Sequence, residues 1–156
     1  MARWENFQIW RGRLPHWRAD NVTYYVTFRH KRELDDWERA TLYARLMKAQ
    51  MGKLDIAILC VLPEKSEMLL RVLEQPSGAP YELTDIIEKC KRKAGQMIVK
   101  KSGERWPPFY TESFDRIIRD EEELESYWLA ILSSPVEEQF VIEPEEWPTL
   151  HVADSP

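Results

Sequence analysis

The sequence has little cysteine, no long apolar run, and almost no Lys or Arg in its last third. Its two cysteines, Cys60 and Cys90, form no CxxC pair, so we expect two free, buried thiols in a reducing cytosol. No segment approaches the roughly 18 consecutive apolar residues that span a bilayer. The first residues mix charges with aromatic rings and lack the apolar centre of a signal peptide. These absences predict a cytoplasmic protein without a membrane partner.

The composition predicts a folded chain of one domain. Of the 156 residues, 44% are hydrophobic and 31% are charged, and seven are tryptophan. A chain of this length and composition buries one well-formed core. We therefore expect a single domain over residues 1–156, with its core at about 20–134 and an acidic C-terminal arm at about 136–156.

Charge is divided unevenly along the chain. Residues 1–105 hold 20 Lys and Arg against 14 Asp and Glu, a net charge of +6, whereas residues 106–156 hold 2 against 13, a net charge of −11. No Lys or Arg follows Arg119. This asymmetry indicates a basic working surface and an acidic C-terminal segment. The alternative is a solvated acidic tail that keeps the protein soluble.

Apolar periodicity and turn residues predict four strands and three helices. In the first helix we expect Trp37, Leu42 and Leu46 to form a buried stripe. Asp120 is expected to cap the third helix, which would end before Pro135. The strands are expected at about 22–28, 54–62, 68–73 and 113–118, and the helices at about 36–51, 82–99 and 121–134.

The order of these elements is strand, helix, strand, strand, helix, strand, helix. This order is the split βαβ pattern of a ferredoxin-like domain. We therefore expect an α+β fold in which an antiparallel four-stranded sheet packs its helices on one face, followed by a C-terminal helix and an extended acidic tail. Many domains that handle nucleic acid have this fold, but a fold alone assigns no function.

Three segments carry a resemblance to a known family. RGRLPHWRADNVTYYVTFR, VLPEKSEMLL and ESFDRIIRDEEEL, together with EPEEWP in the tail, resemble the REP-associated tyrosine transposases of the HUH superfamily over residues 10–150. The resemblance implies a hairpin substrate with adjacent single-stranded DNA. It also implies a His-hydrophobic-His pair that holds a divalent metal such as Mg²⁺ or Mn²⁺, a tyrosine nucleophile, and an amide four residues later that helps to complete the metal site.

The residues that would carry this chemistry are replaced in the sequence. The family string MPNHVHLL falls on residues 62–69, so Lys65 and Glu67 stand at the histidine positions. The string YIxxNP falls on residues 130–135, so Ala130 stands at the nucleophile position and Ser134 at the amide position. The three histidines, His16, His30 and His151, cannot form a His-x-His pair. The resemblance therefore implies no catalytic residue, no metal site and no cofactor.

Two interpretations of residues 64–67 and of Tyr127 remain open. Glu64 and Glu67 are oxygen ligands that would suit Mg²⁺ or Mn²⁺ in a rebuilt active site, although the charge of Lys65 opposes a cation there. Tyr127 lies one helical turn before Ala130 and would then be the nucleophile of an active transposase. In the other reading, residues 64–67 form a solvated turn and Tyr127 is a packing residue.

Binding without cleavage is the function that we expect. Basic and aromatic residues that alternate suit phosphate contact and base stacking, and a basic helix face suits a phosphate backbone. DNA is the expected partner and RNA is also open. A third hypothesis is a protein-interaction module that contacts a partner or a second copy through the acidic C-terminal segment. The candidate nucleic-acid-binding residues are Arg11, Arg13, His16, Trp17 and Arg18, and a second cluster of Lys89, Lys91, Arg92, Lys93, Lys100 and Lys101.

Overall fold

An antiparallel sheet of five strands forms the centre of the protein. The computed structural model describes residues 22–50 and 52–153. The strands lie in the order β4-β1-β3-β2-β5, and all neighbours are antiparallel. Their bounds are β1 Tyr24–Arg29, β2 Leu54–Val61, β3 Lys65–Val72, β4 Phe114–Ile117 and β5 Leu150–Val152.

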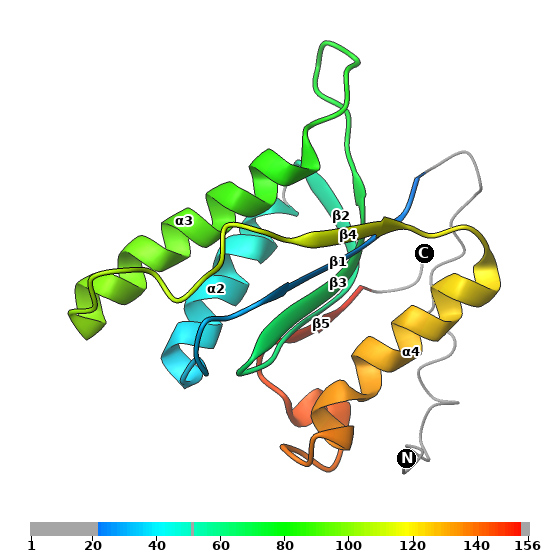
Figure 1. Cartoon of the computed structure of the whole chain (residues 1–156). Coiled ribbons are helices and arrows are strands. Elements are labelled where there is room, and N and C mark those ends of the chain that lie inside the picture. Colours follow the sequence, from blue (N-terminus) through cyan, green and yellow to red (C-terminus); the bar gives the residue numbers. More distant parts are fainter. Residues whose placement is uncertain (1–21, 51, 154–156) are drawn as a thin grey trace.

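Helices cover both faces of this sheet. The bounds are α2 Asp36–Ala49, α3 Leu83–Ser102 and α4 Glu121–Glu137, with a short 3-10 turn, η2, at Pro144–Glu146. Helices α2 and α3 pack on one face, and α4 packs on the opposite face (Figure 1). No helix in the described ranges is both long and apolar enough to span a membrane.

The apolar run of β2 supplies both cores. Leu54, Ile56 and Leu59 belong to the core beneath α2 and α3, whereas Ile58 and Cys60 belong to the core beneath α4. The pairing with β3 shifts register between Ile56 and Ile58, so a bulge changes which residues face each side. A strand with a helix layer on each side needs apolar residues on both faces, which explains the nearly unbroken hydrophobic sequence.

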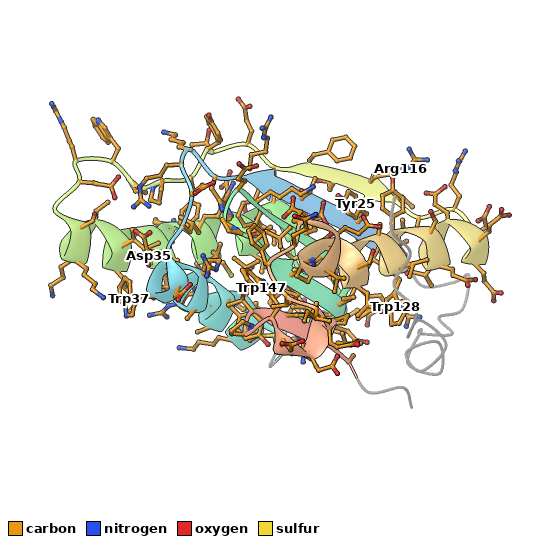
Figure 2. All side chains as sticks on the ribbon, turned by 90° about the horizontal axis from the view of Figure 1, so that it is seen from below. Tyr25, Asp35, Trp37, Arg116, Trp128 and Trp147 are labelled. Atoms are coloured by element: carbon orange, nitrogen blue, oxygen red, sulfur yellow. The ribbon has the colours of Figure 1, made fainter. Side chains whose placement is uncertain are left out.

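The predicted α+β, ferredoxin-like fold is confirmed, but three details of its C-terminal part were wrong. The sheet has a fifth strand, β5, and α4 continues through Pro135 to Glu137. The tail is not an extended arm, because it folds back along β2. Trp147 is buried there, and its indole Nε1 donates a hydrogen bond of 2.9 Å to the carbonyl of Val61 (Figure 2).

The third strand begins earlier than its sequence predicted. The sequence predicts a strand over residues 68–73 and leaves a solvated turn at 64–67 as one reading, yet β3 starts at Lys65, and both Ser66 and Glu67 are buried. Ser66 pairs with Phe28 of β1 and with Val61 of β2, so this segment lies inside the sheet. Pairing on both sides satisfies the backbone and outweighs the polar character of the side chains.

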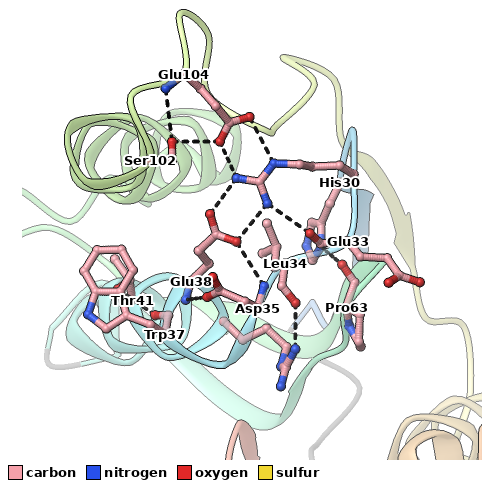
Figure 3. A network of polar contacts seen from close by, with 12 residues as sticks. His30, Glu33, Leu34, Asp35, Trp37, Glu38, Thr41, Pro63, Ser102 and Glu104 are labelled. Carbon is pink, nitrogen blue, oxygen red and sulfur yellow. Dashed lines mark hydrogen bonds and ion pairs between the residues drawn. The ribbon is translucent and has the colours of Figure 1, made fainter.

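The start of α2 is fixed by a buried carboxylate. Asp35 and Glu38 form a capping box, and Arg32 contacts both Glu38 and Glu104, which joins the N-terminus of α2 to the loop after α3 (Figure 3). Hydrogen bonds from Arg32 hold the pKa of Glu38 below its usual value. The predicted burial of Trp37 was wrong, because this ring is 37% exposed and packs under Lys101, whose Nζ lies 4.1 Å from its centroid.

A buried histidine joins β1 to the turn before β3. His30 Nδ1 lies 2.8 Å from the carbonyl of Pro63, so Nδ1 carries the proton. Its Nε2 lies 3.0 Å from Ser66 Oγ, which donates to it. Burial lowers the pKa of His30 to about 4 from 6.5, and the nearby charge of Lys91 acts in the same direction. The neutral imidazole is therefore the form that the fold holds.

This histidine should make stability depend on pH. Because its folded pKa is depressed, the unfolded chain binds the proton more readily between about pH 4 and 6.5. Stability should be full above pH 6.5 and fall by on the order of 2 to 3 kcal/mol as pH drops toward 4. Chemical denaturation at several pH values should show that slope, and His30→Gln should flatten it. An unchanged slope in the variant would contradict this role.

Candidate functional site

The residues at the expected catalytic positions share one face of the sheet. Side chains alternate along β3, so Met68 enters the core beneath α2 and α3, whereas Leu69 enters the core beneath α4. By the same alternation Lys65 and Glu67 point toward α4. The helix in turn brings Ser134 to within 3.5 Å of Glu67, measured from Oγ to Oε2.

Glu67 is the centre of this cluster. Its carboxylate is 2.9 Å from Lys65 Nζ and accepts a hydrogen bond of 3.4 Å from the hydroxyl of Tyr25. Ser134 Oγ has one proton, and its 2.7 Å contact with the carbonyl of Ala130 takes that proton in preference to the longer contact with Glu67. Tyr25, Lys65, Glu67, Ala130 and Ser134 thus meet in one place, from β1, β3 and α4. We call this cluster the Glu67 centre.

The charges of the Glu67 centre hold its side chains in defined protonation states. Burial, and then the charge of Glu67, raise the pKa of Tyr25 to about 12, so its hydroxyl remains protonated at neutral pH. Burial alone would lower the pKa of Lys65, but the hydrogen bond and the charge of Glu67 outweigh it and leave that pKa raised. Burial also raises the pKa of Glu138, to which the charges of Glu64 and Glu67 add.

The side chains of this centre do not fit a divalent metal. Such ions take several oxygen ligands, and here the one buried carboxylate already carries the ammonium group of Lys65. Glu64 is exposed at the edge of the strand pair. Within residues 22–50 and 52–153, no three acidic, His or Cys side chains gather as a metal would need. Tyr127 packs against Tyr25, with ring centroids 4.3 Å apart. Tyr25 in turn pairs with Arg116 of β4, and both residues are labelled in Figure 2.

The predicted basic cluster on α3 is divided by the structure. Lys89, Arg92, Lys100 and Lys101 are exposed, and Lys93 is half-buried. Lys91 was expected on the same surface, but it is 4% exposed and points inward. Its Nζ lies 2.8, 3.3 and 3.2 Å from the carbonyls of Tyr110, Thr111 and Glu112 and 3.0 Å from Ser113 Oγ, so its three protons are shared among four acceptors. Lys91 therefore anchors the segment before β4.

The first predicted cluster cannot be placed. Arg11, Arg13, His16, Trp17 and Arg18 lie outside the described residues, so their role stays a prediction.

Sequence reasoning missed three further cations beside α3. Arg45 and Lys48 of α2 and Lys53 before β2 line a pocket of about 410 Å³ together with Lys89 and Lys93. The signal was present in the sequence, because residues three apart on a helix share a face. Helices α2 and α3 therefore carry a basic surface, whereas α4 on the opposite face begins with Glu121, Glu122 and Glu123.

A wider groove of about 890 Å³ lies where β1 ends. Two exposed aromatic rings, Tyr110 and Phe114, line it. Its charged lining residues are three cations, Arg29, Lys31 and Arg32, and three acidic residues, Glu33, Glu64 and Glu112. Lys31 Nζ lies 5.6 Å from the centroid of the Tyr110 ring. Arg29 pairs across the sheet with Lys65, so the groove adjoins the Glu67 centre.

The architecture is that of a transposase-like domain. A solved REP-associated tyrosine transposase bound to a REP hairpin matches it with a TM-score of 0.64 and 15% sequence identity, over 86% of this chain and 81% of that one. A candidate transposase from Deinococcus radiodurans R1 matches with a TM-score of 0.46 and 11% identity, over 80% and 94%. Family models and curated proteins give no match. At these identities the likeness is one of fold.

Neutralising Lys91 should destabilise the protein, whereas neutralising its neighbour should not. Lys91→Met leaves three carbonyls and one hydroxyl without their donor, which should lower the free energy of unfolding by about 2 to 4 kcal/mol. Lys89→Met removes an exposed charge that lies among other cations, so we expect no measurable loss. Urea denaturation of both variants measures the difference. Equal stability of the two variants would show that Lys91 has no anchoring role.

Proposed function

We propose that this protein binds hairpin or single-stranded DNA in the cytoplasm without cleaving it. The observation that carries the proposal is the ion pair between Lys65 and Glu67, which stands where the resemblance to REP-associated tyrosine transposases expects a metal-binding pair. The transposase-like fold supports a nucleic-acid partner, because the neighbour of similar architecture is bound to a REP hairpin. The two features together favour retained binding and lost chemistry.

The Glu67 centre offers neither a nucleophile nor a free cation for the cleavage of a DNA strand. Attack on a phosphodiester needs a positioned nucleophile and a group that stabilises charge on the phosphate oxygens. Ala130 offers no nucleophile, and Tyr25 keeps its proton because its pKa is raised to about 12. Tyr127 is half-buried against the Tyr25 ring. The ammonium group of Lys65 is held by Glu67 rather than left for a phosphate.

The distribution of charge supports a defined orientation on the nucleic acid. The basic surface of α2 and α3 lies across the sheet from the acidic start of α4. A polyanion attracts the first surface and repels the second, so the α3 side should face the duplex. The groove with Phe114 and Tyr110 offers aromatic faces for unpaired bases next to the duplex.

Removing five cations of α3 should weaken hairpin binding and make it less dependent on salt. The five-fold variant Lys89→Gln, Arg92→Gln, Lys93→Gln, Lys100→Gln and Lys101→Gln should bind a DNA hairpin with a single-stranded flank at least tenfold more weakly at low salt. The slope of log affinity against log salt should fall by about 0.7 to 0.9 for each phosphate contact that is lost.

Fluorescence anisotropy at several salt concentrations measures this effect, with DNA and RNA hairpins in parallel. Arg119→Gln is the control, because this exposed cation lies beside α4 and pairs with Glu123. Its slope should match that of the unmodified protein. Unchanged affinity of the five-fold variant would show that the α3 surface does not contact the hairpin.

A further inference from the structure

The pocket between α2 and α3 has an unusual set of charges. It is lined by the five cations Arg45, Lys48, Lys53, Lys89 and Lys93, and no acidic side chain lines it. The ion pairs between described residues involve other cations, such as Arg32, Arg39 and Arg116. Five positive charges around one hollow repel one another, and a ligand of opposite charge would relieve that repulsion.

The repulsion acts on the pKa of Lys89, which lies below the usual value for a lysine. The charges of Lys53 and Lys93 lower its pKa, in that order, and Arg92 adds to them. Lys89 is fully exposed to water, which normally screens such effects. Lys53 and Lys89 come from segments more than 30 residues apart, so it is the fold that brings the cations together.

The other side chains of the pocket are apolar or aromatic. Ile86 and Cys90 of α3 line it and are buried, and Tyr81 also lines it, with Lys53 Nζ 5.9 Å from the centroid of its ring. Burial raises the pKa of the Cys90 thiol, and its Sγ donates to the carbonyl of Arg45, so this cysteine packs and does not react. The flat ring of a ligand could therefore contact the apolar side chains Ile86 and Cys90 and the aromatic ring of Tyr81.

We propose that this pocket binds a phosphorylated nucleoside, with its phosphates among the lysines and its base beside Tyr81. A single phosphate monoester carries about −1.5 to −2 charges, so two or more phosphates match the five cations best. A hollow of about 410 Å³ lies within the usual range for a small-molecule site. The ligand is either a free nucleoside polyphosphate or the phosphorylated end of a nucleic-acid strand. The second source rests on the DNA binding proposed above.

Calorimetric titration of the full chain with ATP at fixed ionic strength tests the charge requirement. Lys48→Gln combined with Lys53→Gln should weaken ATP binding at least tenfold. Arg105→Gln combined with Arg119→Gln removes the same charge outside the pocket and should change the affinity by less than twofold. The substitution leaves in place the hydrogen bonds of the Lys53 backbone N–H and carbonyl and removes the contact of its Nζ with the Tyr81 ring. Thermal melts of both variants check that they fold.

The ring requirement is tested with inorganic tripolyphosphate. Tyr81→Ala should weaken ATP binding at least threefold and leave tripolyphosphate binding unchanged. No ATP binding, equal loss in both charge variants, or tripolyphosphate binding as tight as that of ATP would each overturn the proposal. The last result would mean a charged patch without a nucleotide site.

A 5′-phosphorylated oligonucleotide distinguishes the two sources of the ligand. If it displaces ATP from the unmodified chain and loses affinity in the Lys48 and Lys53 variant, the site holds a strand end. If ATP binds and is not displaced, the ligand is a free nucleotide. Hairpin binding is measured separately with the variants of α3 residues, so either proposal can fail while the other stands.

Discussion

The ion pair between Lys65 and Glu67 determines the charge at the start of strand β3. Glu67 is 7% exposed, and a buried carboxylate stays charged only when a cation or hydrogen-bond donors offset its desolvation. Lys65 supplies the cation at 2.9 Å, and Tyr25 supplies a donor from the neighbouring strand. Lys65 and Glu67 lie at the start of β3, the central strand, and their side chains point toward α4. A ligand of the Glu67 centre would therefore have to compete with Lys65 and Tyr25 for the carboxylate of Glu67.

The sheet also separates the charges of the molecule. The division was visible in the sequence as a basic first part and an acidic last part, and among the described residues the basic end of α3 and the acidic start of α4 lie on opposite faces of the sheet. The tail contributes to this separation because Trp147 and β5 hold it against β2, on the edge away from β4. As far as residue 153, where the described residues end, the acidic segment is consequently part of the fold. A nucleic acid can approach α3 without displacing it.

Much of the fold was predictable because its signals are local. Capping residues, turn residues and apolar periodicity set the element order, and that order predicts the ferredoxin-like sheet. The start of β3 was not predictable, because Ser66 and Glu67 are polar and only their partners on β1 and β2 bury them. Helical periodicity places Lys91 on the face of Ile87 and Ala94, away from Lys89, but the acceptors that allow a lysine to be buried there lie about twenty residues away in a loop, which the sequence does not show. The shared helix face of Arg45 and Lys48 was visible in the sequence, but only the structure brings that face together with Lys53, Lys89 and Lys93.

The most direct measurement is an assay for covalent attachment to DNA. The protein is incubated with a labelled hairpin that carries a single-stranded flank, in the presence of Mn²⁺ or Mg²⁺, and the products are separated on a denaturing gel. We expect intact DNA and no protein–DNA adduct, under conditions in which anisotropy shows the hairpin to be bound. A covalent adduct that disappears in Tyr127→Phe would contradict binding without cleavage and show a rebuilt active site.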